Sequence, residues 1–377
     1  MRRLALIALA LLLVSSVAAV RLSGQNRPQL VPGPLLAGGG GAVVQAGDSA
    51  SAASLPRLRR AKVQMARLAP PSTRKTFGRA AHNLLPLERE SEVRKFPVVL
   101  PKGIEPRVAS RSSSHGAPSV TARINGLSSN QGQADPPDVQ VAAGPSAIVE
   151  MVNAAYSMWD RSGRLLAAGR LGTLFSSPGD DRRGDWLTDP RVLFDARSGR
   201  WFSALIDVTR REALVAVSDS SDPTAGWKVT ANRFSPDLGG TCPDQPRLGL
   251  SDDVVVVTVD LFRTCEGAFE GGVIIAFDKR ELLAGDAVTT NTYGGRNTFF
   301  SQIAPAVSLS ATGPEYLISI QRDEPTTALL YTVTDPRAPT VPVRPVRITR
   351  MDPPPDAPQK GTIARLQTGD YRVQNAR

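Results

Sequence analysis

The chain has 377 residues, of which 41% are hydrophobic, so it is long enough to bury a large core. Its 32 glycines and 31 prolines are typical of a turn-rich all-β protein. The formal net charge is +10, but residues 21–120 hold 16 Lys/Arg against 5 Asp/Glu, whereas residues 121–377 hold 27 against 30. The part expected to fold is slightly acidic, which gives no electrostatic reason to expect nucleic-acid binding.

Residues 1–19 have the three regions of a secretory signal peptide. Arg2 and Arg3 supply positive charge, Leu4 to Val14 form an apolar stretch, and Val17 to Ala19 provide a small-residue cleavage site. The apolar stretch is too short to favour a membrane-spanning helix. We therefore expect a secreted protein, periplasmic or extracellular, with no transmembrane segment beyond the signal peptide.

Residues 20–117 are predicted to be a disordered basic linker rich in Pro, Gly and Ser. Gly38–Gly41 and Ser49–Ser54 are low-complexity tracts, and Arg57–Arg60 is a basic cluster. Such a segment buries too little apolar area to offset the entropy lost on ordering. Its charge fits either a tether to anionic cell-envelope polymers or a solvated spacer.

The stretch from residue 187 to 229 shows how residues 118–377 are organised. Apolar runs at 192–194, 201–206 and 213–217, and a fourth opening at Gly226, are joined by short polar turns such as Asp195–Gly199. Gly and Asp are the residues that tight turns prefer. Four short apolar runs joined in this way predict an up-and-down antiparallel sheet.

The same plan recurs along the chain. The leading positions Pro137, Pro190, Pro246, Pro305 and Tyr371 are 53, 56, 59 and 66 residues apart. This period predicts a β-propeller of four-stranded antiparallel blades. No segment after residue 118 sustains a helical period, and Lys279–Ala284 is at most one helical turn.

The last residues, Asp370 to Arg377, begin a fifth copy of the plan. The predicted total is about four blades plus the start of a fifth. Either this strand closes the ring by completing the first blade, or the sequence is truncated and further strands follow. We expect truncation, because the fifth copy starts the pattern over, whereas a closing strand should resemble a blade's last strand.

Export makes Cys242 and Cys265, the two cysteines, a predicted disulfide. They bracket one predicted hairpin of the third repeat. A free nucleophilic cysteine would need a base, and both histidines, His82 and His115, lie in the predicted linker. Without histidine, the folded part also cannot host a Ser-His-Asp triad or a histidine-ligated zinc.

Four stretches carry a family resemblance: PPDVQVAAGPSAIVEMVN (136–153), DPRVLFDARSGRWF (189–202), SDSSDPTAGW (218–227) and DQPRLGLSDDVVVVT (244–258). Over residues 120–377 the chain resembles a family of poorly characterised secreted bacterial β-propeller proteins, distantly sialidase-like in architecture. The turn at 220–227 is similar to the Asp-box of sialidase blades, with different spacing around Gly226. Asp-boxes are structural turns, so the resemblance implies a fold and not an activity.

Three leading positions carry an acid followed by an arginine, and a fourth carries Asp138. Since equivalent positions of a propeller meet around its axis, we predict a ligand site at the axial mouth. Its residues are Asp138, Asp189, Arg191, Asp244, Arg247, Asp370 and Arg372.

The same residues permit two different roles. Three arginines aimed at one point would bind a carboxylate, as in sialidases, with Asp138 or Asp189 as general acid and Tyr371 as nucleophile. Alternatively, each Asp pairs with a neighbouring blade's Arg and forms a structural belt.

Two further features have structural alternatives. The acidic loops at 180–185 and 251–253 supply oxygen ligands for Ca²⁺, but Asp is also the usual turn residue, so no cofactor is expected and calcium is the alternative. Trp159, Trp186, Trp201 and Trp227 are able to stack on sugars, but packing between blades is the expected role of those within strands.

The sequence thus predicts an exported binding or scaffold module without an assigned catalytic residue, with carbohydrate or a cell-envelope polymer as its partner. The alternative is a sialidase-like glycoside hydrolase that uses the same ring of Asp and Arg.

Overall fold

The computed structural model describes residues 53–71, 123–134, 136–234, 238–265, 267–296, 300–321, 325–350, 355–359, 363, 365–366 and 376, all within one compact unit, Ala42–Arg377. The predicted signal peptide, both histidines and residues 370–372 lie outside these residues. Over the described part the protein is all-β with three short helices, as predicted. No described helix is long and apolar enough to cross a membrane.

Strands that follow one another in sequence pair in antiparallel order and form four groups, which we call meanders 1 to 4. Meander 1 is a four-stranded sheet of β3 (Gln140–Ala143), β4 (Ala147–Val152), β5 (Ala155–Asp160) and β6 (Leu165–Arg170). Meander 2 consists of β7 (Leu187–Asp195), β8 (Arg200–Asp207), β9 (Glu212–Ser218) and β10 (Trp227–Arg233), and β2 (Ala66–Arg67) adds to β10.

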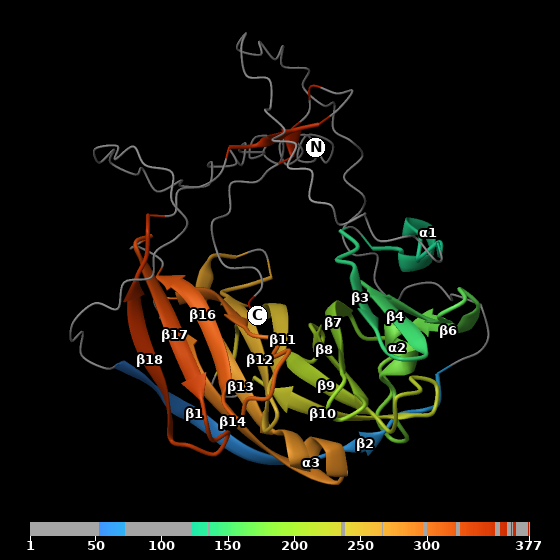
Figure 1. Cartoon of the computed structure of the whole chain (residues 1–377), viewed down its shortest axis with the longest axis horizontal. Coiled ribbons are helices and arrows are strands. Elements are labelled where there is room, and N and C mark those ends of the chain that lie inside the picture. The colour runs from blue at the N-terminus through green and yellow to red at the C-terminus, as the bar shows by residue number, and fades with distance from the viewer. Residues whose placement is uncertain are drawn as a thin grey trace, which may run out of the picture. The chain divides into compact units, whose positions relative to one another are not determined.

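Meander 3 consists of β11 (Cys242–Leu250), β12 (Val254–Phe262), β13 (Phe269–Asp278) and β14 (Ala287–Arg296). Meander 4 consists of β15 (Phe300–Pro305), β16 (Glu315–Gln321), β17 (Thr327–Val333) and β18 (Thr340–Arg347). Both belong to one nine-stranded sheet, because β1 (Ala53–Gln64) lies between β14 and β18 and pairs with each (Figure 1). The remaining elements are α1 (Ser129–Gly132), α2 (Leu171–Leu174), α3 (Lys279–Ala284), β19 (Ala357–Pro358) and β20 (Arg365–Leu366).

The prediction of disorder is wrong for residues 53–71. Strands β1 and β2 run along the outer edges of meanders 2, 3 and 4, where β10, β14 and β18 would otherwise present unpaired backbone groups. The backbone N–H of Leu68 donates to the carbonyl of Trp227 at 2.9 Å, and Leu68 is buried. The order of this segment therefore comes from edges far along the chain and not from its own composition.

Three hydrophobic clusters join successive meanders. The first contains Met151 and Tyr156 of meander 1 with Trp201 of meander 2. The second joins meander 2 to meander 3, and the third joins meander 3 to meander 4. Trp201 and Trp227 are fully buried, which confirms their packing role. Each meander therefore packs its face on the next one, which fixes where the leading strands lie.

The hairpin between β9 and β10 is the turn that resembles an Asp-box. The carboxylate of Asp222 accepts hydrogen bonds from the backbone N–H and hydroxyl of Thr224, and the indole of Trp227 donates to the carbonyl of Pro223 at 2.7 Å. These contacts are internal to the turn, so this hairpin is structural. The helical turn expected at 279–284 is α3, whose N-terminus is capped by Asp278.

Candidate functional site at the leading strands

Each meander has one non-glycine residue with left-handed backbone near the start of its first strand, within the first four residues of β7, β11 and β15 and two residues before β3. These residues are Asp138, Asp189, Gln245 and Gln302, with φ of 43°, 53°, 47° and 51°. They are 51, 56 and 57 residues apart along the sequence. In β7, β11 and β15 this residue lies within a shift of strand register, which indicates that the four positions are structurally equivalent.

This equivalence changes which residues of the predicted repeats correspond to one another. The counterpart of Asp189 is Gln245 and not Asp244, and the fourth leading residue is Gln302 and not Ala304 or Pro305. Alignment on proline fails because Pro137 precedes its left-handed residue, whereas Pro190 follows its own.

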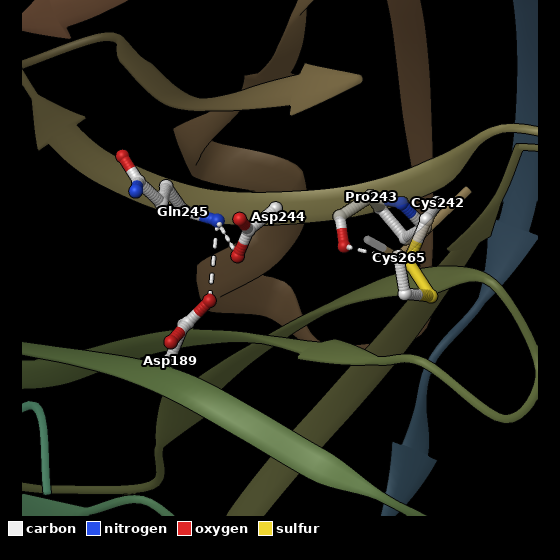
Figure 2. Close-up of a disulfide and its surroundings, with 6 residues drawn as sticks. All are labelled: Asp189, Cys242, Pro243, Asp244, Gln245 and Cys265. Atoms are coloured by element: carbon white, nitrogen blue, oxygen red, sulfur yellow. Dashed lines mark hydrogen bonds between the residues drawn. A yellow bond between two sulfur atoms is a disulfide. The ribbon is translucent and has the colours of Figure 1, made fainter. Parts of the chain in front are cut away.

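Hydrogen bonds connect the four left-handed residues in one chain. The amide of Asn153 donates to Asp138 Oδ2 at 2.8 Å and accepts from the backbone N–H of Asp189 at 2.7 Å. Asp189 Oδ2 accepts from the backbone N–H of Gln245 at 3.1 Å (Figure 2). Gln302 then donates through Nε2 to Gln245 Oε1 at 2.8 Å. The leading residues of all four meanders thus meet in one polar chain.

A pocket of about 710 Å³ opens on this chain. It is lined by residues of meanders 1, 2 and 3, including the five described members of the predicted ligand set: Asp138, Asp189, Arg191, Asp244 and Arg247. Asp370 and Arg372 lie outside the described residues. Trp186, one of the tryptophans considered for stacking on sugars, also lines the pocket. Lining residues that the sequence analysis did not single out include Gln140, Asn153, Thr188, Gln245 and Phe262.

The carboxyl groups of the pocket lie against one another. Asp189 on β7 points toward Asp244 on β11 (Figure 2). Burial, followed by the hydrogen bond to Asp244 and the charge of that residue, raises the pKa of Asp189 to about 6. Burial also raises the pKa of Asp138, and the charge of Asp189 raises it further. Asp189 therefore exchanges a proton close to neutral pH, as a general acid or a proton-dependent ligand contact requires.

The two described arginines of the pocket do not pair with these carboxylates. Arg191 Nε donates to the carbonyl of Pro246 at 2.6 Å, and burial lowers the pKa of Arg191. Arg247 Nη1 donates to the carbonyl of Gln245 at 3.3 Å and lies 3.9 Å from a carboxylate oxygen of Asp260. Among the described residues, no Lys or Arg nitrogen lies within 4.0 Å of the carboxylates of Asp138, Asp189 or Asp244.

This geometry departs from the predicted belt, in which each pocket carboxylate would pair with an arginine. The predicted cluster of three arginines includes Arg372, which lies outside the described residues, so that part stays a prediction.

The predicted disulfide is present, with Cys242 and Cys265 bonded at 2.05 Å. Both cysteines line the pocket, and Cys242 lies two residues before Asp244 (Figure 2). The bond ties the start of β11 to the loop after β12, so it restrains the strand that carries Asp244.

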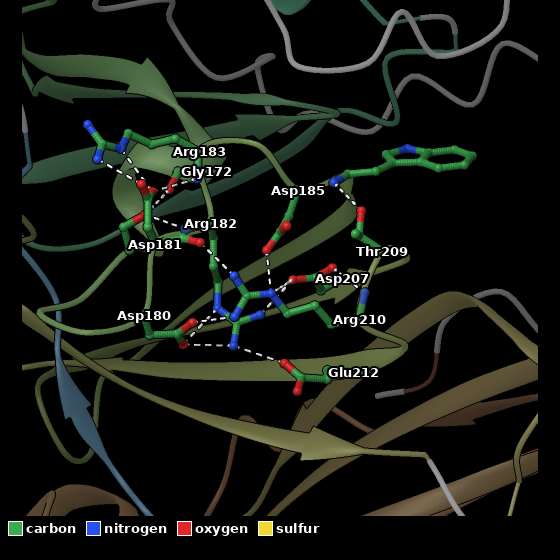
Figure 3. Close-up of polar contacts among 12 residues, drawn as sticks. Gly172, Asp180, Asp181, Arg182, Arg183, Asp185, Asp207, Thr209, Arg210 and Glu212 are labelled. Atoms are coloured by element: carbon green, nitrogen blue, oxygen red, sulfur yellow. Dashed lines mark hydrogen bonds and ion pairs between the residues drawn. The ribbon is translucent and has the colours of Figure 1, made fainter.

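The aspartates of the acidic loop at 180–185 form ion pairs with arginines. Asp180 accepts from Arg182 and Arg210, Asp181 pairs with Arg183, and Arg182 also reaches Asp207 on β8 (Figure 3). In the second acidic loop, Asp252 Oδ2 accepts from the backbone N–H of Thr312 at 3.1 Å. Within the described part of the chain, no group of three or more His, Cys, Asp or Glu residues is placed to hold a metal ion.

Of the residues in the hydrogen-bonded chain, sequence reasoning missed Asn153, Gln245 and Gln302. Asn153 follows the apolar strand β4, and its counterpart Asp260 lies near the end of β12, where Asp260 Oδ1 accepts from the backbone N–H of Gln302 at 3.1 Å. A polar residue at the end of the second apolar run of a repeat was the available signal. It repeats in meanders 1 and 3, whereas Ile206 stands at this position in meander 2.

Comparisons with known proteins place the chain in no family. No protein-family model matches the sequence, and no curated protein matches it significantly. Three solved structures match, all of exo-beta-1,3-galactanase from Phanerochaete chrysosporium. The complex with galactose is 10% identical over 55% of this chain and 49% of that chain, with a TM-score of 0.32. A Glu-to-Gln variant of the same enzyme with beta-1,3-galactotriose is 11% identical over the same shares of the two chains, with a TM-score of 0.31.

The match spans about half of the length of these neighbours. A likeness at this level carries no argument about fold or activity. The resemblance to secreted bacterial propellers therefore stays a prediction.

Proposed function

We propose that the protein is an exported β-propeller binding module whose ligand, a carbohydrate or a cell-envelope polymer, occupies the pocket at the leading strands. In this proposal the four meanders are blades, and their leading strands surround a common axis. The observation that carries the proposal is the convergence of five residues from three successive meanders on one pocket. No described Lys or Arg nitrogen lies within 4.0 Å of its carboxylates, although the charge of Arg191 acts on Asp138 and Asp189. A structural role alone would not need an open pocket beside them.

The proposal places Ala376 on a further leading strand beside meander 4. Its support is a repeated contact between leading strands. Leu250 of meander 3 forms a parallel bridge with Val307 of meander 4, and Ala306 forms a parallel bridge with Ala376. The backbone N–H of Val307 donates to the carbonyl of Ala376 at 3.1 Å. Ala376 thus lies beside meander 4 as meander 4 lies beside meander 3. A strand completing meander 1 would pair there instead.

The chemistry of the pocket suits a polyhydroxylated ligand. Carboxylates accept hydrogen bonds from sugar hydroxyls, and the guanidinium of Arg191 and the amides of Gln140 and Gln245 donate them. Trp186, which is half-buried at the pocket, offers an aromatic face to a sugar ring. A pocket of this size lies within the range of small-ligand sites, about 300–1,000 Å³.

The second candidate is a glycoside hydrolase, which the raised pKa of Asp189 favours. An acid that titrates near pH 6 suits protonation of a leaving group. However, the two carboxyl groups of a glycosidase are held about 5 Å or more apart, so that the sugar fits between them. Asp189 is in hydrogen-bond contact with both Asp138 and Asp244, so we favour binding over hydrolysis.

One experiment separates the two. Binding of galactose, glucuronic acid and N-acetylneuraminic acid is followed through the indole NMR signal of Trp186, and release of a fluorogenic group is followed for aryl glycosides and aryl sialosides. The binding proposal expects a saturable shift that Arg191→Ala weakens by about tenfold, the effect of losing one charged hydrogen bond, and no turnover. Asp219→Asn, in the outer hairpin, is the control and should bind like wild type.

Turnover that Asp189→Asn abolishes would establish the hydrolase instead. Absence of any shift or turnover across both panels would contradict a carbohydrate site.

A further inference from the structure

Asn153 occupies a special place in the pocket because it contacts two of the three carboxyl-bearing residues. It lies directly after β4, is only 3% exposed, and reaches meander 2 with its side chain. Its Nδ2 donates to Asp138 Oδ2 at 2.8 Å and to the carbonyl of Pro136 at 2.9 Å. Its Oδ1 accepts from the backbone N–H of Asp189 at 2.7 Å and from the hydroxyl of Thr188 at 3.1 Å.

The amide thus uses both donor hydrogens and both acceptor positions. One half of the side chain orients the carboxylate of Asp138, and the other half holds the backbone of Asp189 in its left-handed conformation. A buried amide with all four hydrogen bonds made adopts a single orientation. The positions of Asp138 and Asp189 relative to each other are therefore fixed. Neither Ala nor Leu at this position could replace the donor or the acceptor.

The contact between meanders 2 and 3 shows why the position of Asp189 depends on Asn153. Meander 2 has Ile206 where meanders 1 and 3 have Asn153 and Asp260. Here the backbone N–H of Gln245 bonds to two carboxylates, Asp244 Oδ1 at 2.8 Å and Asp189 Oδ2 at 3.1 Å. Asp189 is held on one side by meander 1 and holds meander 3 on its other side. Any displacement of its backbone would pass directly to Gln245 and to the neighbouring Asp244.

We propose that Asn153 is the positioning residue of the pocket, which sets the orientation of Asp138 and Asp189 and thereby the affinity and proton dependence of ligand binding. The part about affinity rests on the proposed function, whereas the part about orientation does not. The hydrogen bond from Asn153 opposes the rise in the pKa of Asp138 that burial and Asp189 cause. The charged groups facing Asp138 from β7 are Asp189 and Arg191, and both remain when Asn153 is replaced.

The test needs no ligand in its first arm. Carboxyl carbon NMR titrations follow Asp138 and Asp189 in wild type, Asn153→Ala and Asn153→Asp, and amide hydrogen exchange follows the N–H of Asp189. Asn153→Asp keeps the acceptor for Asp189 but loses the donor to Asp138, so the Asp138 pKa should rise while the Asp189 amide stays protected. In Asn153→Ala the Asp138 pKa should rise and the Asp189 amide should exchange faster.

Asn291→Ala is the matched control, because Asn291 is a fully buried asparagine of the outer strand β14 whose side chain bonds to the carbonyl of Pro336. It should lower the melting temperature without moving either titration. If Asn153→Ala behaves like Asn291→Ala, with unchanged titration of Asp138, Asn153 only stabilises the fold and the proposal is wrong.

The second arm measures affinity for whichever monosaccharide of the panel binds wild type. Asn153→Asp should weaken binding by about tenfold, as expected for one lost hydrogen bond to a charged group, and should change its pH profile. A changed titration without any sugar binding would refute the proposed function and leave the positioning role intact. Unchanged titration with intact binding would refute the positioning role alone.

Discussion

Two regions of the molecule are built from the same residue types and behave oppositely. In the acidic loop at 180–185, which we call the outer loop, Arg182 contacts Asp180 at 2.9 Å, Asp207 at 2.6 Å and Glu212 at 2.9 Å (Figure 3). In the pocket at the leading strands, Asp138, Asp189 and Asp244 lie next to one another. Within the described residues, none of these three has an arginine or lysine nitrogen within 4.0 Å.

The electrostatics follow this arrangement. The arginines that contact Asp180 hold its pKa below the usual value, although burial opposes them. In the pocket, burial and the neighbouring Asp244 act in the same direction and raise the pKa of Asp189 to about 6, although the hydrogen bonds with Gln245 and Asp138 oppose them. Asp207, on β8 beside the outer loop, does not follow this pattern. Its burial and the charge of Asp185 raise its pKa to about 6 even though Arg182 contacts it. Both regions contain Asp and Arg, so the arrangement of the charges, and not their presence, distinguishes the pocket.

The largest effect should come from Arg182→Ala. Asp207 and Glu212 are essentially unexposed. Removal of the guanidinium takes away the closest cation of Asp207 and leaves Glu212 with Arg233 alone. We expect a loss of about 3–5 kcal/mol in the free energy of unfolding, measured by urea denaturation. Sugar binding at the pocket should be retained under conditions where the variant is folded. A loss below about 1 kcal/mol would show that this network is not the structural element described here.

Removal of the disulfide should come next. The double variant Cys242→Ser with Cys265→Ser frees the start of β11, and opening a loop with a sequence separation of 23 costs roughly 3 kcal/mol. The same variant should weaken ligand binding, since Asp244 loses its restraint, whereas Arg182→Ala should not. Equal binding by wild type and the double variant, both fully folded, would contradict a positioning effect of this bond.

Asp189→Asn should change the pH dependence of stability. The pKa of Asp189 is 3.8 in the reference state and about 6 in the folded protein, so the folded state holds the proton more tightly between these values. Stability therefore falls as pH rises from about 4 to 6, and the asparagine variant escapes this loss while keeping an acceptor for Gln245. Above pH 6 it should be more stable than wild type by on the order of 1–2 kcal/mol, and at pH 3 the two should agree. Parallel denaturation curves across this range would contradict the raised pKa.

The smallest effect should come from Arg183→Ala. Its pair with Asp181 lies at the surface of the same outer loop, with side-chain exposures of 69% and 58%. Because solvent screens such a pair and the side chains keep their mobility, the unfolding midpoint should not change measurably. A clear loss of stability would mean that the outer loop acts as one unit and that Arg182 is not its centre.

Much of the fold follows from local pattern. The apolar runs at 201–206 and 213–217 lie within β8 and β9, and the turn residues between them lie at the observed hairpin. The pairing of Cys242 with Cys265 follows from the expected export to an oxidising compartment. The convergence of Asp138, Asp189 and Asp244 follows from the spacing of the sequence repeat. These features depend on residues close in sequence, or on a repeat that brings equivalent positions together.

The remainder depends on contacts that no local pattern carries. Strand β1 is basic, with three arginines and a lysine, and it is ordered because β14 and β18 offer it two open edges. The phase of the repeat is set by backbone conformation at Gln245 and Gln302, which proline positions do not report. The role of Asn153 arises only when meander 1 meets meander 2.

The most direct test of the account is the pKa of Asp189 in wild type and in Asp244→Asn, followed by carboxyl carbon NMR. The two residues belong to different meanders, so their coupling reports the convergence of the leading strands. We expect a pKa of about 6 in wild type and a lower value in Asp244→Asn, while burial, the largest cause of the rise, remains in both proteins. A pKa of Asp189 that does not change in Asp244→Asn would show that the two side chains do not meet, and the convergence of the leading strands would be contradicted.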